Sequence, residues 1–211
     1  MNTIIKSFVI VFFTALAIFS QGFKVKASGE QTFSFEDKYG RNQATFFSTT
    51  PLEDITGITN DVKGSVTFNV DDFSTLKGKI SISVASLKTG IDLRDEHLRS
   101  ANWLDAESYP EAVFNIKSVN NIQVVEPNKL RAKVSGDFTT HGVTKEVVAD
   151  ATVTYLDESD DTKKRAPGDL IGVQAKFSIV LSDFDVENMI LGQKVSDDIE
   201  ISVNIVGSNA K

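Results

Sequence analysis

The sequence predicts an all-β protein built from antiparallel strands, and three observations lead to this fold class. From residue 28 onward, apolar and polar side chains alternate with period two in one segment after another. The continuous apolar runs that are typical of parallel strands do not occur in that part of the sequence. A helical signal is found only over residues 92–104. One short helix cannot cover about eight strands, so the sheet has to cover itself, as a closed barrel or as a two-sheet sandwich.

Each predicted strand has one apolar face, and the strands follow one another along the chain. These faces are formed by Phe33 and Phe35; by Val66, Phe68 and Val70; by Ile80, Ile82 and Val84; by Ala112, Phe114 and Ile116; by Leu130, Ala132, Val134 and Phe138; by Val147, Ala149, Ala151 and Val153; by Val173, Ala175, Phe177 and Ile179; and by Ile199, Ile201, Val203 and Ile205. A further strand is expected over residues 45–49. Because Phe46 and Phe47 are adjacent, the alternation does not indicate which of them points inward.

Two connections have their own signals. The helix expected over residues 92–104 starts with Asp92 as its N-cap, and Asp95 follows three residues later. Residues 157–169 (DESDDTKKRAPGD) are a charged block, which predicts an exposed, mobile hairpin loop.

The first 27 residues have the pattern of a secretory signal peptide. Lys6 precedes an uncharged apolar run of 12 residues, from Phe8 to Phe19. A membrane-spanning helix needs roughly 20 apolar residues, so this run is short for an anchor. Val25 and Ala27 occupy the positions that signal peptidase reads, which predicts a mature domain of residues 28–211 starting at Ser28. We therefore expect a periplasmic or secreted protein that is not inserted in a membrane after processing; an uncleaved N-terminal anchor is the alternative.

Composition excludes several classes of function. The chain has 22 Lys and Arg against 29 Asp and Glu, for a formal charge of -7. This acidic balance argues against nucleic acid as a partner, because phosphates attract clustered basic side chains. The absence of Cys excludes disulfides, thiolate metal sites and cysteine nucleophiles.

The sequence has little that could support catalysis. His97 and His141 are its only histidines, and no nucleophile elbow, His-Glu-x-x-His motif or phosphate-binding glycine loop occurs. His97 is close in sequence to Asp92, Asp95 and Glu96, yet a solvated or hydrogen-bonded histidine is the commoner role there. His141 lies in a predicted turn, where hydrogen bonding is again the commoner role. We therefore expect no catalytic residue, no metal and no cofactor.

The aromatic residues leave the state of the interior open. The chain carries 15 Phe against three Tyr and one Trp, and many of these Phe lie on the apolar faces. An eight-stranded barrel can be filled by its own side chains or can hold one ligand. The small inward residues Ala149, Ala151 and Ala175 would leave space inside such a barrel. A packed core and a hollow lumen are equally compatible with this pattern.

Two long motifs resemble the signatures of the YceI-like family. The first lies within residues 87–114 and comprises Arg94, Asp95, His97, Leu98, Arg99, Ser100, Trp103, Asp105, Ala106, Tyr109 and Pro110. The second covers residues 136–147 (GDFTTHGVTKEV), and residues 64–71 resemble a third, weaker signature.

The resemblance implies a lipocalin-like closed barrel of about eight strands, with one short helix in a long loop, whose lumen holds a polyisoprenoid chain such as a quinone precursor. The lumen residues expected to contact this lipid are Phe68, Phe114, Phe138, Ala149, Ala151, Ala175 and Phe177. Those expected at the mouth are Arg94, His97, Leu98, Arg99, Trp103 and His141. The alternative role for the four charged or polar mouth residues is to tie the long loop onto the barrel rim.

The expected function is therefore lipid binding without chemistry, with an isoprenoid or another long-chain lipid as the partner and a homodimer left open. Two other functions remain as alternatives: a ligand-free interaction or stress-response barrel, and an enzyme acting on a lipid. The sequence does not specify the head group, the chain length or the pathway.

Overall fold

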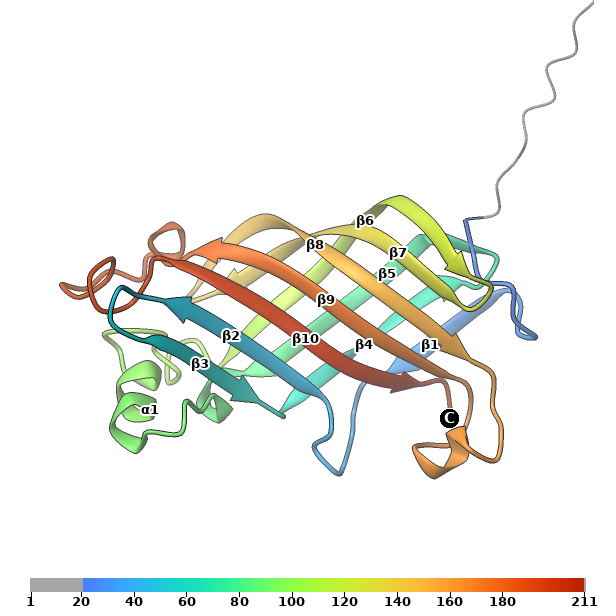
Figure 1. Cartoon of the computed structure of the whole chain (residues 1–211), viewed down its shortest axis with the longest axis horizontal. Helices are drawn as coiled ribbons and strands as arrows, with labels where there is room; N and C mark the ends of the chain where they lie inside the picture. The colour runs from blue at the N-terminus through green and yellow to red at the C-terminus, as the bar shows by residue number, and fades with distance from the viewer. Residues whose placement is uncertain (1–20, 211) are drawn as a thin grey trace, which may run out of the picture.

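The computed structural model describes residues 21–210, in which ten antiparallel strands surround an apolar interior (Figure 1). The strands are β1 (Glu30–Ser34), β2 (Gln43–Thr49), β3 (Asp54–Thr59), β4 (Val62–Asn69), β5 (Asp72–Ser83), β6 (Glu111–Glu126), β7 (Lys129–Thr140), β8 (Val143–Leu156), β9 (Leu170–Val180) and β10 (Asp198–Ser208). One α-helix, α1 (Asp92–Arg99), lies between β5 and β6, and short 3-10 turns occur at Val84–Ser86, Thr162–Lys164 and Leu181–Phe184.

Eight of the strands close into a barrel. Their order is β1-β4-β5-β6-β7-β8-β9-β10, and β10 pairs back with β1 through Ser208 and Ser34. A sandwich has no such closing pair, so this contact decides between the two architectures that alternation alone leaves open. The barrel is the expected fold, with β2 and β3 as an additional hairpin.

The hairpin extends the barrel wall where β1 is too short to do so. β1 reaches only one end of β10, and β2 pairs with the opposite part of β10, from Ile199 to Asn204. The buried Asn42 lies at the junction, where its Nδ2 donates to Phe35 O (2.7 Å) and its Oδ1 accepts from Val206 N (2.8 Å). These bonds satisfy backbone groups that have no strand partner at that point.

All eight predicted apolar faces point inward, where they contribute to two apolar clusters or to the wall of a cavity. On β2, Phe46 lines the cavity and Phe47 is exposed, so Phe46 is the inward member of the adjacent pair. β6 continues to Glu126, well beyond the alternating residues that predicted it. Its register against β7 shifts between Ile116 and Ser118 and again further along, which breaks the period-two pattern in the second half of the strand.

Two connections differ from their predictions. Helix α1 ends at Arg99, five residues early, and Asp92 is its first residue; the N-cap position is taken by Ile91 without a side-chain bond. The loop over residues 157–169 is exposed as predicted, but hydrogen bonds tie it to its surroundings. Arg165 Nη1 pairs with Asp37 Oδ2 at 3.0 Å, and Asp157 accepts from Lys26 N at 3.1 Å.

The expected signal peptide falls only partly on described residues. Residues 1–20 lie outside them, whereas residues 21–27 pack against the barrel. Phe23 is 3% exposed and its N–H donates to Val70 O at 2.8 Å, while Phe73 N donates to Gln21 O at 3.1 Å. A Cβ on Gly22 would lie 2.2 Å from the backbone of Asp71, so only glycine allows this close approach. The packed domain therefore begins before Ser28.

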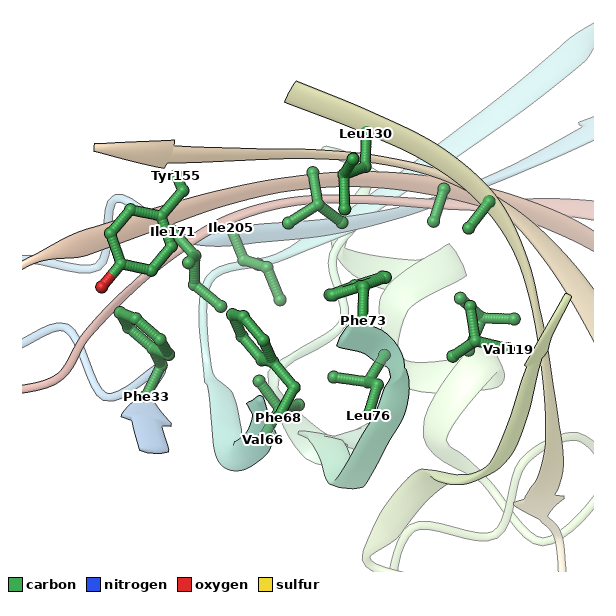
Figure 2. Close-up of a cluster of buried hydrophobic side chains, with 14 of the residues drawn as sticks. Phe33, Val66, Phe68, Phe73, Leu76, Val119, Leu130, Tyr155, Ile171 and Ile205 are labelled. Atoms are coloured by element: carbon green, nitrogen blue, oxygen red, sulfur yellow. The ribbon is translucent and has the colours of Figure 1, made fainter. Parts of the chain in front are cut away.

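Aromatic side chains close the end of the barrel near the N-terminal segment (Figure 2). The rings of Phe33 and Phe68 stack at 5.6 Å, and those of Phe68 and Phe73 meet edge to face at 5.2 Å. Tyr155 completes the cluster and places its hydroxyl 2.6 Å from Asp169 Oδ2; burial and this bond raise the pKa of Tyr155 above its usual value. We call this the closed end of the barrel. Across residues 21–210, no helix is long and apolar enough to cross a membrane.

Candidate functional site

A cavity of about 500 Å³ lies inside the barrel, within the size range of ligand sites in proteins. Its floor is formed at the closed end by Phe68, Phe73 and Ile205, and its wall is lined almost entirely by apolar side chains of the strands. The side chains that seal the floor from below, including Phe33 and Tyr155, are fully buried. The cavity is therefore blind at this end.

A row of small residues explains why the barrel is hollow at mid-height. Ala151 of β8 pairs with Ala175 of β9, Ala175 with Val203 of β10, and Val203 with Ala44 of β2. All four line the cavity. Directly opposite residues on neighbouring strands lie side by side, and because barrel strands are tilted, the row crosses the wall obliquely and leaves a band of it without large side chains.

The other end of the cavity, which we call the mouth, is built by three connections. These are the β2–β3 turn, the connection from β5 to β6 that contains α1, and the long connection from β9 to β10, all at the left of Figure 1. The backbone of Lys88 exchanges two hydrogen bonds with Ile58 of β3, which fixes the residues before α1 to the edge of the hairpin.

The titratable side chains that line the cavity all lie at the mouth. They are Glu53, Arg94, His97 and Lys194, and each comes from one of the three connections. Arg94 Nη2 lies 3.2 Å from Glu53 Oε2, in an ion pair that links α1 to the β2–β3 turn. The interior is thus apolar along its depth and charged at its opening.

Asp95 holds the start of α1 in place. Its buried carboxylate accepts 2.6 Å hydrogen bonds from both the amide and the hydroxyl of Thr89. Burial raises the pKa of Asp95, but the two bonds from Thr89 and the nearby Arg99 more than offset this, so its pKa lies below the usual value. The charged form of Asp95 therefore stabilises the mouth.

The seven predicted lumen residues all line the cavity: Phe68, Phe114, Phe138, Ala149, Ala151, Ala175 and Phe177. Of the predicted mouth residues, Arg94, His97, Leu98 and Trp103 also line it. Their contact with a ligand stays a prediction.

Two predicted mouth residues do not line the cavity. Arg99 turns from the last turn of α1 toward the carbonyl oxygens of Ala85 and Leu87, at 3.4 and 3.5 Å. His141 occupies the β7–β8 turn with a φ of 49°, and its Nδ1 lies 3.0 Å from Phe184 O. Its ring also meets that of Tyr109 at 5.0 Å. Both side chains tie loops to the barrel, which is the alternative role named for them from the sequence.

Several lining residues have no counterpart in the predictions. Glu53 and Lys194 complete the charged mouth, and Ile91, Leu93 and Ile190 supply apolar contacts there. The consecutive apolar residues 189–191 could have indicated that this connection takes part in the mouth, since a run of apolar residues in a loop is uncommon.

The arrangement suits binding of an apolar chain. Within residues 21–210, no three His, Cys, Asp or Glu side chains lie together in a way that could hold a metal ion. His97 is exposed on α1, and the nearby Asp95 carboxylate accepts its hydrogen bonds from Thr89.

Comparison with solved structures supports the fold. BcnA of Burkholderia cenocepacia superposes with a TM-score of 0.64 at 19% identity, covering 81% of this chain and 99% of that one. A polyisoprenoid-binding domain from Saccharophagus degradans, implicated in plant cell wall breakdown, gives 0.62 at 16% identity and covers 87% of this chain and 100% of that one. At these identities the likeness is one of fold.

Comparison of sequences identifies the family. The chain is 33% identical over 177 residues to a UPF0312 protein of Pseudomonas fluorescens, covering 83% of this chain and 86% of that protein. It is 30% identical over 155 residues to the protein YceI of Escherichia coli O6:H1, covering 74% of each. The family model described as the YceI-like domain matches residues 32–207, which is most of the barrel. The chain therefore belongs to the YceI-like family.

Proposed function

We propose that this protein is an exported carrier that holds the chain of an isoprenoid-type amphipathic lipid in its lumen and performs no reaction on it. The observation that carries the proposal is the blind apolar cavity, whose titratable lining residues all lie at the mouth. A polyisoprenoid quinone or its precursor has the same distribution, with a long apolar chain and one polar head group. The structural relative described as a polyisoprenoid-binding domain supports this ligand class.

The shape of the cavity gives the lipid one orientation. Since the floor is closed, the chain enters tail first and the head group stays beside Arg94, His97 and Lys194. Each CH₂ group that leaves water for the lumen contributes about 0.8 kcal/mol, so burial alone can hold a long chain with few polar contacts.

Export is supported by the N-terminal sequence, in which Lys6 precedes the apolar run of residues 8–19. The buried position of Phe23 supports processing before this residue rather than after Ala27. N-terminal sequencing of the mature protein should therefore find a start no later than Phe23. A mature chain that starts at Ser28 would contradict cleavage before Phe23. Membrane-bound protein that still starts at Met1 would contradict export of a soluble carrier.

Native mass spectrometry of gently purified protein tests the binding function. We expect a co-purifying isoprenoid mass and, after delipidation, saturable 1:1 uptake of geranylgeraniol delivered in detergent. Palmitic acid is the comparison ligand, because it tests whether a branched isoprenoid chain is preferred. A ligand-free mass together with no uptake of geranylgeraniol would contradict the proposal and favour a ligand-free interaction or stress-response barrel.

A further inference from the structure

Five large apolar side chains are exposed around the mouth of the barrel. Leu52 is on the β2–β3 turn, Ile91 and Leu93 are at the start of α1, and Met189 and Ile190 are on the connection from β9 to β10. We call this set the apolar rim. Leu52 and Met189 are 92% and 91% exposed, the highest values among large hydrophobic side chains of the described residues. Exposed apolar groups gathered at one place commonly mark an interaction surface.

The rim is continuous with the lumen. Ile91, Leu93 and Ile190 are exposed to solvent and also line the cavity, so one apolar surface leads from the outside of the molecule to its interior. The three connections that carry the rim project at the same end of the barrel (Figure 1). A ligand that is insoluble in water could pass over this surface without entering water.

The charges near the rim specify what kind of surface it fits. The segments that carry it, residues 50–54, 91–99 and 185–197, contain eight Asp and Glu against three Lys and Arg. Anionic lipid attracts clusters of basic side chains, and the acidic excess here opposes such attraction. Exposed apolar side chains that lead into an apolar lumen, with an acidic excess around them, fit a zwitterionic bilayer surface, which accepts apolar groups and carries no net charge.

We propose that the apolar rim docks the mouth of the barrel onto a zwitterionic lipid bilayer, so that lipid passes between membrane and lumen without crossing water. This inference rests on the proposed carrier function, because it assigns the site where the carrier loads and unloads. Leu52 and Met189 enter the interface from two different connections, and Ile91, Leu93 and Ile190 join the membrane to the cavity.

Flotation of the purified protein with phosphatidylcholine vesicles tests the docking. We expect binding by the unaltered protein and a loss of about tenfold or more in the double variant Leu52→Glu and Met189→Glu, because interfacial binding scales with buried apolar area. Both side chains are almost fully exposed, so their replacement should leave folding intact.

The matched control is the double variant Val124→Glu and Val125→Glu. These side chains are also exposed, carry the same change of charge, and lie on β6 beside the β6–β7 turn at the opposite end of the barrel. This variant should bind vesicles as the unaltered protein does. Adding phosphatidylglycerol to the vesicles should weaken binding of the unaltered protein, and stronger binding would contradict the charge argument.

Uptake of geranylgeraniol from detergent separates this inference from the function on which it rests. The rim variant should take up the detergent-delivered lipid normally and extract it from phosphatidylcholine vesicles slowly. Normal uptake without any vesicle binding by the unaltered protein would overturn the docking proposal and leave the carrier function standing. Vesicle binding with no uptake would overturn the carrier function instead. Self-association that the rim variant abolishes, without vesicle binding, would replace the bilayer with a second copy of the chain.

Discussion

Ala151 illustrates how a single small side chain shapes the lumen. It faces the cavity from the middle of β8, opposite Ala175 on the neighbouring strand. A larger side chain here would project into open space, whereas the same change in a close-packed core would force strain. The effect of enlargement therefore reports whether the barrel is hollow at this level.

We expect Ala151→Phe to reduce geranylgeraniol uptake by at least about tenfold. The melting temperature should change by no more than about 2–4 °C, which corresponds to about 1 kcal/mol of stability for a domain of this size. Calorimetry and a binding titration measure the two effects. Thr152→Phe is the control, since the adjacent side chain points to the outer face and its replacement should leave uptake unchanged. A destabilised Ala151→Phe protein with unaltered uptake would show a packed core.

Asp37 anchors a charged cluster outside the lumen. Its carboxylate accepts hydrogen bonds from Arg41 Nη2 at 2.8 Å and Arg165 Nη1 at 3.0 Å, joining the β1–β2 connection to the loop over residues 157–169. The hydrogen bond from the Arg41 side chain, together with that from Arg165, holds the pKa of Asp37 well below its usual range despite the opposing effect of burial. The charged form of Asp37 is thus favoured by folding.

Replacing this carboxylate should make stability less dependent on pH. Asp37→Asn should lower the free energy of unfolding by about 1.5–3 kcal/mol at pH 7, the range for hydrogen bonds to charged groups. Because the folded-state pKa is depressed, the contribution is complete above the unfolded-state value of about 3.9 and is lost as the pH falls toward the folded-state value. Urea denaturation of both proteins at pH 7 and pH 3 should show the gap narrowing in acid; a constant gap would contradict this account.

At the scale of elements, the N-terminal segment acts as part of the closed end. Phe23 packs against Phe68, Phe73 and Tyr155 with ring centroids 5.6–5.9 Å apart. Lys24 N adds a 2.6 Å hydrogen bond to Pro127 O in the β6–β7 turn. A segment with the pattern of a leader therefore supplies a core aromatic residue.

Phe23→Ala should destabilise the mature protein by about 3–5 kcal/mol, as expected for removal of a buried phenylalanine ring. Denaturant unfolding measures this loss. Lys24→Ala, at an exposed neighbouring position, is the control and should stay within about 0.5 kcal/mol of the unaltered protein. Equal stability of Phe23→Ala and the unaltered protein would indicate that the mature chain begins after this residue.

For the whole molecule, the barrel combines a closed end, a hollow middle and a mouth with titratable side chains. A ligand that binds only the folded state stabilises it in proportion to the logarithm of its concentration. At a free concentration 100 times its Kd, geranylgeraniol should stabilise the protein by about 2.7 kcal/mol, which raises the melting temperature by about 5–10 °C. The Ala151→Phe variant should lose this shift in the same thermal scan, and retention of the shift would place the ligand outside the lumen.

The order of the amino acids was enough to predict which side chains face the interior. Alternation with period two separates the two faces of a strand, so residues such as Phe114, Ala151 and Phe177 can be assigned to the lumen from the order of the amino acids alone. It also indicated which loop carries the mouth, because the motif around His97 and Trp103 resembles a family signature.

Closure of the sheet, the depth of the cavity and the loops that meet at its mouth became visible in the folded chain alone. The closing pair of Ser34 and Ser208 joins β1 to β10, the first and last strands of the described residues, and Glu53, Arg94 and Lys194 converge from segments that are far apart in sequence. Arg99 and His141 turn toward backbone carbonyls instead, because their directions are set by the end of α1 and by a turn with positive φ. Periodicity describes each strand separately, whereas closure and convergence depend on strand register around the barrel, which alternation does not encode.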